Sequence, residues 1–436
     1  MMAEKEGSCN RLFVAVHAGA GYHSAEKECE YKAACKKACL QAMSLLKKGY
    51  SAFAAAIKAT VILEDAECTN AGRGSNLTLT GSIECDASVM DGSTCLFGAV
   101  GCVSGVLNPV QLAGKLIDMQ KDNSLSHGRI PPSVLVGEGA RIWAKQHGIK
   151  VDEDNQLITE KSKRQYKKYK RRIETATDST PKKKAALDDI FLSAQNDGTS
   201  LESENLQKHI SKKNNGAQHN TASPHDTVGA ICLDSQGNLA AAVSSGGIWL
   251  KHPGRLGPAA MYGAGCWAQN PENGYPGVAV ITSGSGEHLM KTLFAKTCAD
   301  CIYTTDNATQ GLNTSFTSHF LDSKLLKGLD SRLAGALALK VLESNEGREL
   351  ELVWGHTTLS MALGYMWGED LKPRVLISKL SEQAKEGKSF SLSGAFFSSE
   401  KSPCVQECCL HQSNLNEKVS QCLQTLASAD RLMPRL

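Results

Sequence analysis

A long polar segment divides this 436-residue chain into two apolar, glycine-rich parts. Residues 150–224 are rich in Lys, Asn, Ser, Gln and Asp, a composition typical of a mostly mobile segment with some helical stretches. A regular apolar pattern resumes abruptly at residues 225–234, HDTVGAICLD. Because a loop of this length inside a compact domain needs a functional reason, we expect the boundary beside Thr227 to matter for function.

The positive charge of the chain is concentrated in this segment. Eleven lysines and arginines oppose two acids between Lys161 and Lys184, whereas the whole chain carries a formal net charge of only +3. The rest of the molecule is therefore mildly acidic, which argues against a basic folded surface for nucleic acid. Direct nucleic-acid binding by the segment itself is also unexpected, because only two tyrosines lie between its basic residues.

Two basic clusters in the segment, KSKRQYKKYKRR and PKKK, are spaced like a bipartite nuclear import signal. The alternative is a solvated charge run, which is common in linkers. We expect import receptors as partners and a distribution between nucleus and cytoplasm. The basic residues of the signal are Lys161, Lys163, Arg164, Lys167, Lys168, Lys170, Arg171, Arg172, Lys182, Lys183 and Lys184.

Membrane insertion, disulfides and metal binding are not expected. No stretch reaches the roughly 18 apolar residues of a membrane-spanning helix, and the N-terminus lacks the pattern of a signal peptide. Sixteen cysteines in an intracellular chain are expected to be free thiols. The Cys298/Cys301 pair and the cluster of Cys404, Cys408, Cys409 and His411 lack the paired spacing of a zinc site, so no metal or organic cofactor is predicted.

Apolar periodicity outlines strands and helices on both sides of the polar segment. Ser51 is suited to cap the second helix. After about residue 380 the pattern fades. Strands are expected at 12–18, in short pieces over 76–108, at 225–234 and 239–245 as a hairpin, and at 277–282; helices are expected at 25–48, 51–65, within 109–148, at 286–304 and at 330–345.

The polar segment ends at Asp226-Thr227, where a strand begins. A threonine hydroxyl becomes a good nucleophile only when a base takes its proton. If the chain is cut before Thr227, the new α-amine, with an ordinary pKa of about 7.7–8, can be that base. One residue then supplies nucleophile and base. The alternative is a β-branched residue that simply suits the start of a strand.

Seven sequence blocks favour the first interpretation, because together and in this order they resemble the type 2 asparaginase family of N-terminal nucleophile hydrolases. The resemblance implies an α+β fold, a four-layer αββα sandwich, within about 12–148 and 225–370. The blocks are HAGAG (17–21), TNAGRGSNLTLTG (69–81), ECDASVMDG (84–92), TVGAICLDSQGNLAAAVSSGG (227–247), HPGRLG (252–257), SGSGE (283–287) and HTTLSMALGYM (356–366).

The resemblance also implies roles for individual residues. Thr227 matches the nucleophile, and Ser245 matches a hydroxyl residue that assists it, usually threonine in the family. Ser283 and Gly284 match the pair that forms the oxyanion hole. Asn70 matches a loop residue near the nucleophile.

Three further positions complete the implied site. Gly19 lies in the backbone turn that faces it. Arg255 matches the arginine that binds the substrate carboxylate, a task suited to its bidentate fork. Lys27 follows the HAGAG turn and is a candidate contact for an acidic substrate, the alternative being an ordinary exposed lysine.

Two departures from the family pattern bear on substrate choice. Asp226 precedes the nucleophile where asparaginases usually have glycine, and Pro258 stands where they carry the acid that holds a free α-amine. Without that acid, the site suits an Asp side chain within a peptide. The sequence is in these respects similar to the threonine aspartase (taspase) branch, which implies a threonine endopeptidase that cleaves after Asp in nuclear regulators such as transcription factors and histone methyltransferases.

Two other functions remain open. One is an L-asparaginase or isoaspartyl peptidase that acts on free Asn or isoaspartyl dipeptides, and the other is a non-catalytic nuclear binding protein that keeps the fold. On the peptidase interpretation, self-cleavage between Asp226 and Thr227 yields an α subunit (1–226: 12–148 ordered, 150–224 a flexible basic linker) and a β subunit (227–436, with a poorly patterned tail at 380–436). The family resemblance implies an α2β2 assembly of these chains.

Overall fold

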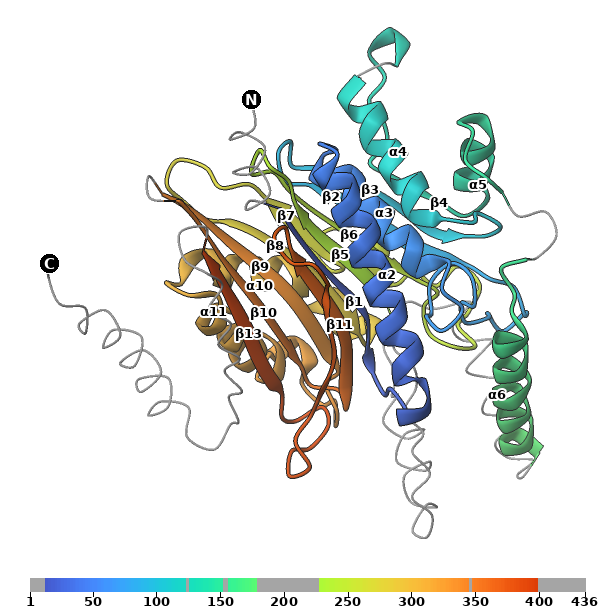
Figure 1. The fold of residues 1–436 in the computed structure, drawn as a ribbon. Coiled ribbons are helices and arrows are strands. Elements are labelled where there is room, and N and C mark those ends of the chain that lie inside the picture. Colours follow the sequence, from blue (N-terminus) through green and yellow to red (C-terminus); the bar gives the residue numbers. More distant parts are fainter. Residues whose placement is uncertain (1–11, 123–124, 152–155, 179–226, 345–346, 399–436) are drawn as a thin grey trace, which may run out of the picture.

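The computed structural model describes residues 12–122, 125–151, 156–178, 227–344 and 347–398 (Figure 1). Within them the chain forms two β-sheets with helices packed against them. The predicted strands at 12–18, 225–234 and 239–245 are present and lie side by side in the larger sheet, although the polar segment separates the first from the other two in sequence. This pairing unites the two apolar halves of the chain.

The larger sheet has eight strands in the order β12-β11-β1-β5-β6-β2-β3-β4. All pairs are antiparallel except β3–β4. The tight turn Asp234–Asn238 closes the β5–β6 hairpin. The bounds are β1 Phe13–Gly21, β2 Cys85–Asp91, β3 Leu96–Val103, β4 Val134–Val136, β5 Val228–Leu233, β6 Leu239–Ser245, β11 Ser360–Trp367 and β12 Arg374–Lys379.

The smaller sheet has five antiparallel strands in the order β13-β10-β9-β8-β7. The bounds are β7 Cys266–Gln269, β8 Gly277–Gly284, β9 Ala334–Ser344, β10 Gly347–His356 and β13 Ser391–Ser398.

Helices pack against both sheets. Ser51 caps α3 as predicted, because its hydroxyl accepts a hydrogen bond from Ala54 N. The helices are α2 Glu28–Lys47, α3 Ala52–Glu64, α4 Pro109–Asp122 and α5 Gly137–Gln146 beside the larger sheet, α6 Glu160–Asp178 at the edge of the molecule, and α9 Gly286–Lys291, α10 Phe294–Thr304 and α11 Ala308–Thr314 after β8.

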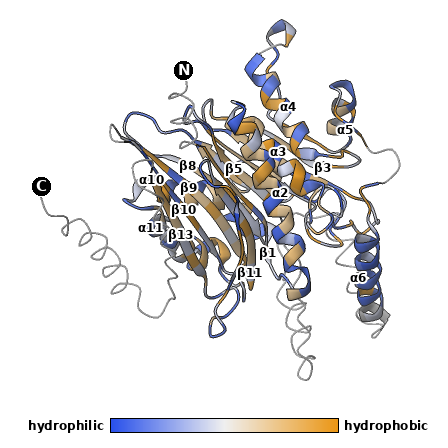
Figure 2. Cartoon of the chain, in the orientation of Figure 1, coloured by the Kyte–Doolittle hydropathy of each residue, from blue (hydrophilic) through white to orange (hydrophobic). Residues whose placement is uncertain are grey.

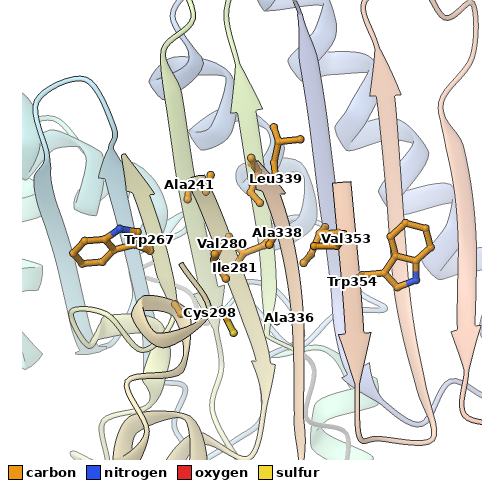
Figure 3. Close-up of a cluster of buried hydrophobic side chains, with 14 of the residues drawn as sticks. Ala241, Trp267, Val280, Ile281, Cys298, Ala336, Ala338, Leu339, Val353 and Trp354 are labelled. Atoms are coloured by element: carbon orange, nitrogen blue, oxygen red, sulfur yellow. The ribbon is translucent and has the colours of Figure 1, made fainter. Parts of the chain in front are cut away.

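The strand period of two distributes each strand's side chains between two cores. Phe13 and Ala15 of β1 face the cluster that joins the sheets, whereas Val14 and Val16 face the cluster beneath α2 and α3. Figure 3 shows the first cluster, where Val280 and Leu339 lie among alanines and Cys298 of α10 approaches them. Small residues let the layers approach closely, which explains the high alanine content of the strands.

This architecture agrees with a mixed α/β fold of the expected class, and the four-layer order remains a prediction. Two local expectations need correction. The segment 330–345 is not a helix, because Ala334–Ser344 forms β9 between β8 and β10. The tail after residue 380 contains a regular element, β13, paired along β10. The polar linker contains α6, a 19-residue helix, in agreement with the helical stretches expected there; hydrophilic residues predominate along it (Figure 2).

The described residues lack both a membrane-spanning helix and a candidate metal cluster. No helix in the structurally described part of the chain is long and apolar enough to cross a membrane. The same residues contain no group of three or more His, Cys, Asp or Glu side chains arranged to hold a metal ion. Asp226, Lys182–Lys184, the cluster around Cys404 and the remaining tail lie outside the described residues.

Buried histidine makes the stability of this fold depend on pH. Burial lowers the pKa of His356 from 6.5 to about 4, although its contact with the Thr358 backbone opposes the shift. Between these values the unfolded chain binds a proton that the folded chain does not, so stability falls as the pH falls. Between pH 7 and pH 5 this histidine lowers the free energy of unfolding by about 2 kcal/mol. We expect His356→Gln to remove that part of the pH dependence when the free energy is measured by urea unfolding.

The exposed His127 provides the control. His127→Gln should leave the pH dependence of unfolding as it is in the wild-type protein. An unchanged slope in His356→Gln would contradict the account.

Candidate active site

The β5–β6 hairpin places two hydroxyl groups at its open end. Val228 pairs with Ser244, so Thr227 and Ser245 lie at the adjoining ends of the two strands. The Thr227 hydroxyl donates a hydrogen bond of 3.2 Å to Ser245 Oγ, which also accepts one of 3.0 Å from Gly247 N. Both residues are only 4% exposed. The site therefore holds the Thr227 hydroxyl in a defined orientation and largely away from bulk water.

A loop from the N-terminal half fixes the turn that follows β6. Asn70 Nδ2 and Asn76 Nδ2 each donate 2.8 Å hydrogen bonds to Gly247 O. Gly246 N donates to Asn70 O at 2.7 Å, and Asn76 N donates to Asn70 Oδ1 at 2.8 Å. Asn70 thus lies at the site as expected, and its side chain positions backbone next to Ser245.

The end of β8 forms the opposite side of the site. Ser283 is fully buried, and its hydroxyl accepts a 3.0 Å hydrogen bond from Ala20 N in the β1 bulge, next to Gly19. Gly284 lines the cavity around Thr227. Its φ of 134° and the 2.6 Å approach of Leu333 O to an added Cβ both require glycine. The fold therefore places Ser283, Gly284 and the turn at Gly19, which the sequence assigned to one site, on the same side of the molecule as Thr227.

Arg255 lies in the same cavity, within a cradle of glycines. A Cβ added at Gly247, Gly257 or Gly286 would come within 3.3, 2.9 or 2.4 Å of its guanidinium. The Nε and Nη2 atoms of Arg255 donate to Glu287 Oε1 at 2.9 and 2.7 Å. Burial alone would raise the pKa of Glu287, but the Arg255 charge and its hydrogen bonds bring it below its ordinary value.

Two buried charges that the sequence did not suggest hold the arginine loop, residues 246–257. Lys251 is 2% exposed and donates to Gly246 O at 2.9 Å and to Glu84 O. Asp86 is fully buried and accepts 2.8 Å hydrogen bonds from Cys102 N and Gly257 N. Burial raises the pKa of Asp86, while Lys251, these two amides and Arg255 act in the opposite direction.

His17 is another buried group that sequence reasoning did not single out, although it begins the HAGAG block. It pairs with Gly229 across β1–β5 and therefore shares the inner face with Thr227. Burial lowers the pKa of His17 to about 3, against a smaller effect of the Thr227 backbone. The ring is therefore neutral at physiological pH.

The cavity beside Thr227 is small, and none of its described lining residues is an acid. Its volume is about 10 Å³, close to that of a single water position. Pro258 occupies the wall at which the family pattern places an acid. Among the described residues, the lining consists of Asn70, Thr227, Ser245, Gly247, Ile248, Arg255, Pro258, Gly284 and Gly286.

A second cavity of about 350 Å³ adjoins the first, because Asn70 lines both. Four cations line it, Lys27 beside β1 and Lys161, Arg164 and Lys168 of α6, and its described lining contains no acid. α6 is held there by several contacts. Lys161 donates to the Glu67 and Cys68 carbonyls, Tyr166 donates to Leu79 O at 3.1 Å, and Tyr169 stacks on Trp249 with ring centroids 4.0 Å apart. The first basic cluster thus forms a wall of this pocket.

Comparison with known proteins identifies relatives over most of the chain. The sequence profile described as "Asparaginase" matches residues 10–329. An isoaspartyl peptidase/L-asparaginase from Xenopus laevis is 32% identical over 283 residues, covering 65% of this chain and 73% of the relative. The Homo sapiens protein of the same description is 31% identical (66% and 75%), and an isoaspartyl peptidase from Escherichia coli is 32% identical (65% and 75%).

The glycine cradle leads to a test of the site's geometry. Gly286→Ala places a methyl group 2.4 Å from Arg255 Nη2 and 2.8 Å from Pro258 Cδ, so the guanidinium must shift. We expect the affinity for a small dicarboxylate such as succinate, measured by calorimetry, to fall about tenfold or more, the equivalent of about 1.4 kcal/mol. The urea unfolding midpoint should also fall, because the rigid Pro258 ring must move as well as the guanidinium, so binding is compared well below the midpoint.

Gly139→Ala in α5 is the matched control, since an added Cβ there meets nothing within 4 Å. It should leave succinate binding unchanged. Equal affinities for succinate in Gly286→Ala and the wild-type protein would show that the glycine cradle does not control carboxylate binding by Arg255.

Proposed function

The chain belongs to the asparaginase family, whose members are hydrolases, and we propose that it is an autoprocessing threonine endopeptidase that cleaves peptide bonds after Asp. The observation that carries the proposal is the pairing of a buried Thr227–Ser245 couple with Arg255 in a cavity whose described lining has no acid. Such a cavity offers a carboxylate-binding group but no partner for the ammonium group of a free amino acid.

Self-processing would begin with the Thr227 hydroxyl. Its oxygen attacks the Asp226 carbonyl carbon, and the peptide is converted into an ester that frees the Thr227 amine. Water then hydrolyses the ester, which leaves an Asp226 carboxylate and a new N-terminal threonine. Ser245 Oγ, which accepts from Thr227, orients the attacking hydroxyl in this step.

The processed enzyme would use the same atoms on a substrate. The Thr227 α-amine accepts the hydroxyl proton as the oxygen attacks the backbone carbonyl carbon of a substrate Asp, and passes it to the amine of the next residue, which leaves. Backbone at Ser283 and Gly284 stabilises the developing oxyanion. Arg255 binds the Asp carboxylate and so selects the bond. Water completes the cycle by hydrolysing the acyl-threonine ester.

The cationic cavity supports a peptide substrate with further acidic groups. It adjoins the nucleophile cavity at Asn70, and its size lies within the range of ligand pockets. Lys27, Arg164 and Lys168 would face carboxylates of residues that flank the scissile Asp. Nuclear regulatory proteins remain the proposed substrates, with import receptors as partners, location in nucleus and cytoplasm, and an α2β2 assembly.

A second candidate is an L-asparaginase or isoaspartyl peptidase. The relatives, at about one-third sequence identity, are isoaspartyl peptidases and L-asparaginases, which favours this candidate over an endopeptidase. A direct comparison separates the two. Purified protein should cleave a peptide with an internal Asp flanked by acids and release little ammonia from free asparagine or little product from an isoaspartyl dipeptide. Turnover of the small substrates without peptide cleavage would establish the second candidate.

Removal of the nucleophile should leave a folded protein. Thr227→Val deletes only the hydroxyl and keeps the β-branched shape, so we expect an uncut chain with a wild-type circular dichroism spectrum and no hydrolytic activity. A variant that fails to fold would indicate that Thr227 acts mainly in packing.

Arg255→Ala, in parallel, should lower cleavage after Asp much more than it lowers stability.

Adjacent positions on α6 test the cationic cavity. Lys168 lines the cavity, whereas Lys167 is exposed and does not. Lys168→Glu should raise KM for an acid-flanked peptide about two- to tenfold, and Lys167→Glu should leave it unchanged, because only the first places a negative charge beside the ligand. Equal effects of both variants on KM would show that overall charge, and not a ligand in the cavity, accounts for the change.

A further inference from the structure

The charge of Arg255 is already compensated by the protein. Glu287 Oε1 accepts from both Nε and Nη2, and Asp86 lies behind the guanidinium next to Gly257. Lys251 and the half-buried Glu84, whose carboxylate accepts from Gly254 N, complete the surroundings. A substrate carboxylate added to this cluster would introduce uncompensated negative charge in a largely buried place, which is unfavourable unless another acid leaves.

The acids differ in how easily they can leave. Both oxygens of Asp86 are bound to backbone amides, and its side chain is fully buried. Glu287 instead lies on the short helix α9 with its side chain 52% exposed, and one of its oxygens takes both bonds to Arg255. Its carboxylate can therefore rotate into water at low cost. The cavity, at about 10 Å³, also requires some side chain to move before a ligand enters.

We propose that Glu287 is the resident ligand of Arg255 and that the substrate carboxylate binds by displacing it. This inference rests on the proposed carboxylate-binding role of Arg255. Glu287 then acts as an internal competitor that sets the affinity of the site for acidic ligands. It also determines specificity. When a substrate side chain displaces the Glu287 carboxylate, Arg255 loses a negatively charged partner, and only another carboxylate replaces that charge.

A positioning role for Glu287 would change the affinity for carboxylates in the opposite direction. If Glu287 only held the guanidinium in its working orientation, its removal would weaken carboxylate binding. The sign of the change in affinity therefore decides between a competitor and a positioning residue.

The experiment compares Glu287→Gln with the wild-type processed protein, using succinate as the probe in calorimetry. We expect succinate to bind about two- to fivefold more tightly to Glu287→Gln, the range for removing a half-exposed ion pair. Asp300→Asn, which removes the acid of the exposed Lys296–Asp300 pair, is the control and should not change the affinity. Weaker or equal binding to Glu287→Gln, or no succinate binding to either protein, would overturn the inference.

Two further arms separate this inference from the proposed function. In an Arg255→Ala background, Glu287→Gln should have no effect on succinate binding, because the guanidinium for which Glu287 and succinate compete is absent. With an Asp-containing peptide, Glu287→Gln should lower KM and leave kcat unchanged. If the wild-type protein cleaves no such peptide, the endopeptidase proposal fails, and the succinate comparison still tests the competitor.

Discussion

The antiparallel pairing of β5 and β6 fixes the distance between Thr227 and Ser245, and the rest of the site is arranged around these two hydroxyls. The pairing is covered on both sides, by β1 next to β5 and by β2 next to β6. Strands held on both edges cannot slip by one residue without turning their buried side chains to the wrong face. A hydrogen bond of 3.2 Å between two nearly buried hydroxyls is therefore a consequence of sheet register.

The site is completed by residues from both sides of Thr227. Asn70 and Asn76 hold Gly247, and Asp86 holds Gly257, so the N-terminal half positions the turn after β6 and the arginine loop. A cut before Thr227 would leave these contacts intact, because β1 and β2 remain within the larger sheet. The same interdependence explains why an N-terminal threonine could be generated without loss of the site.

The sequence predicted what depends on local pattern and on motifs. Two apolar runs on either side of the turn at residues 234–238 located the β5–β6 hairpin, and the blocks located Thr227, Ser245 and Arg255. It missed what depends on distant neighbours. Alanine and leucine in 334–344 favour a helix until β8 and β10 supply strand partners. The many lysines of α6 make the segment resemble a solvated linker in sequence, although Tyr166 and Tyr169, three residues apart, attach the helix to the rest of the protein. Glu287 and Asp86 approach Arg255 only in three dimensions.

The central claim is that Thr227 is a nucleophile freed by cleavage of its own peptide bond. The most direct measurement is the intact mass of the purified wild-type chain together with N-terminal sequencing of its fragments. We expect two fragments that remain associated, the second beginning Thr-Val-Gly-Ala. A single chain of 46.6 kDa that stays uncut during prolonged incubation, or a fragment beginning at another residue, would contradict it.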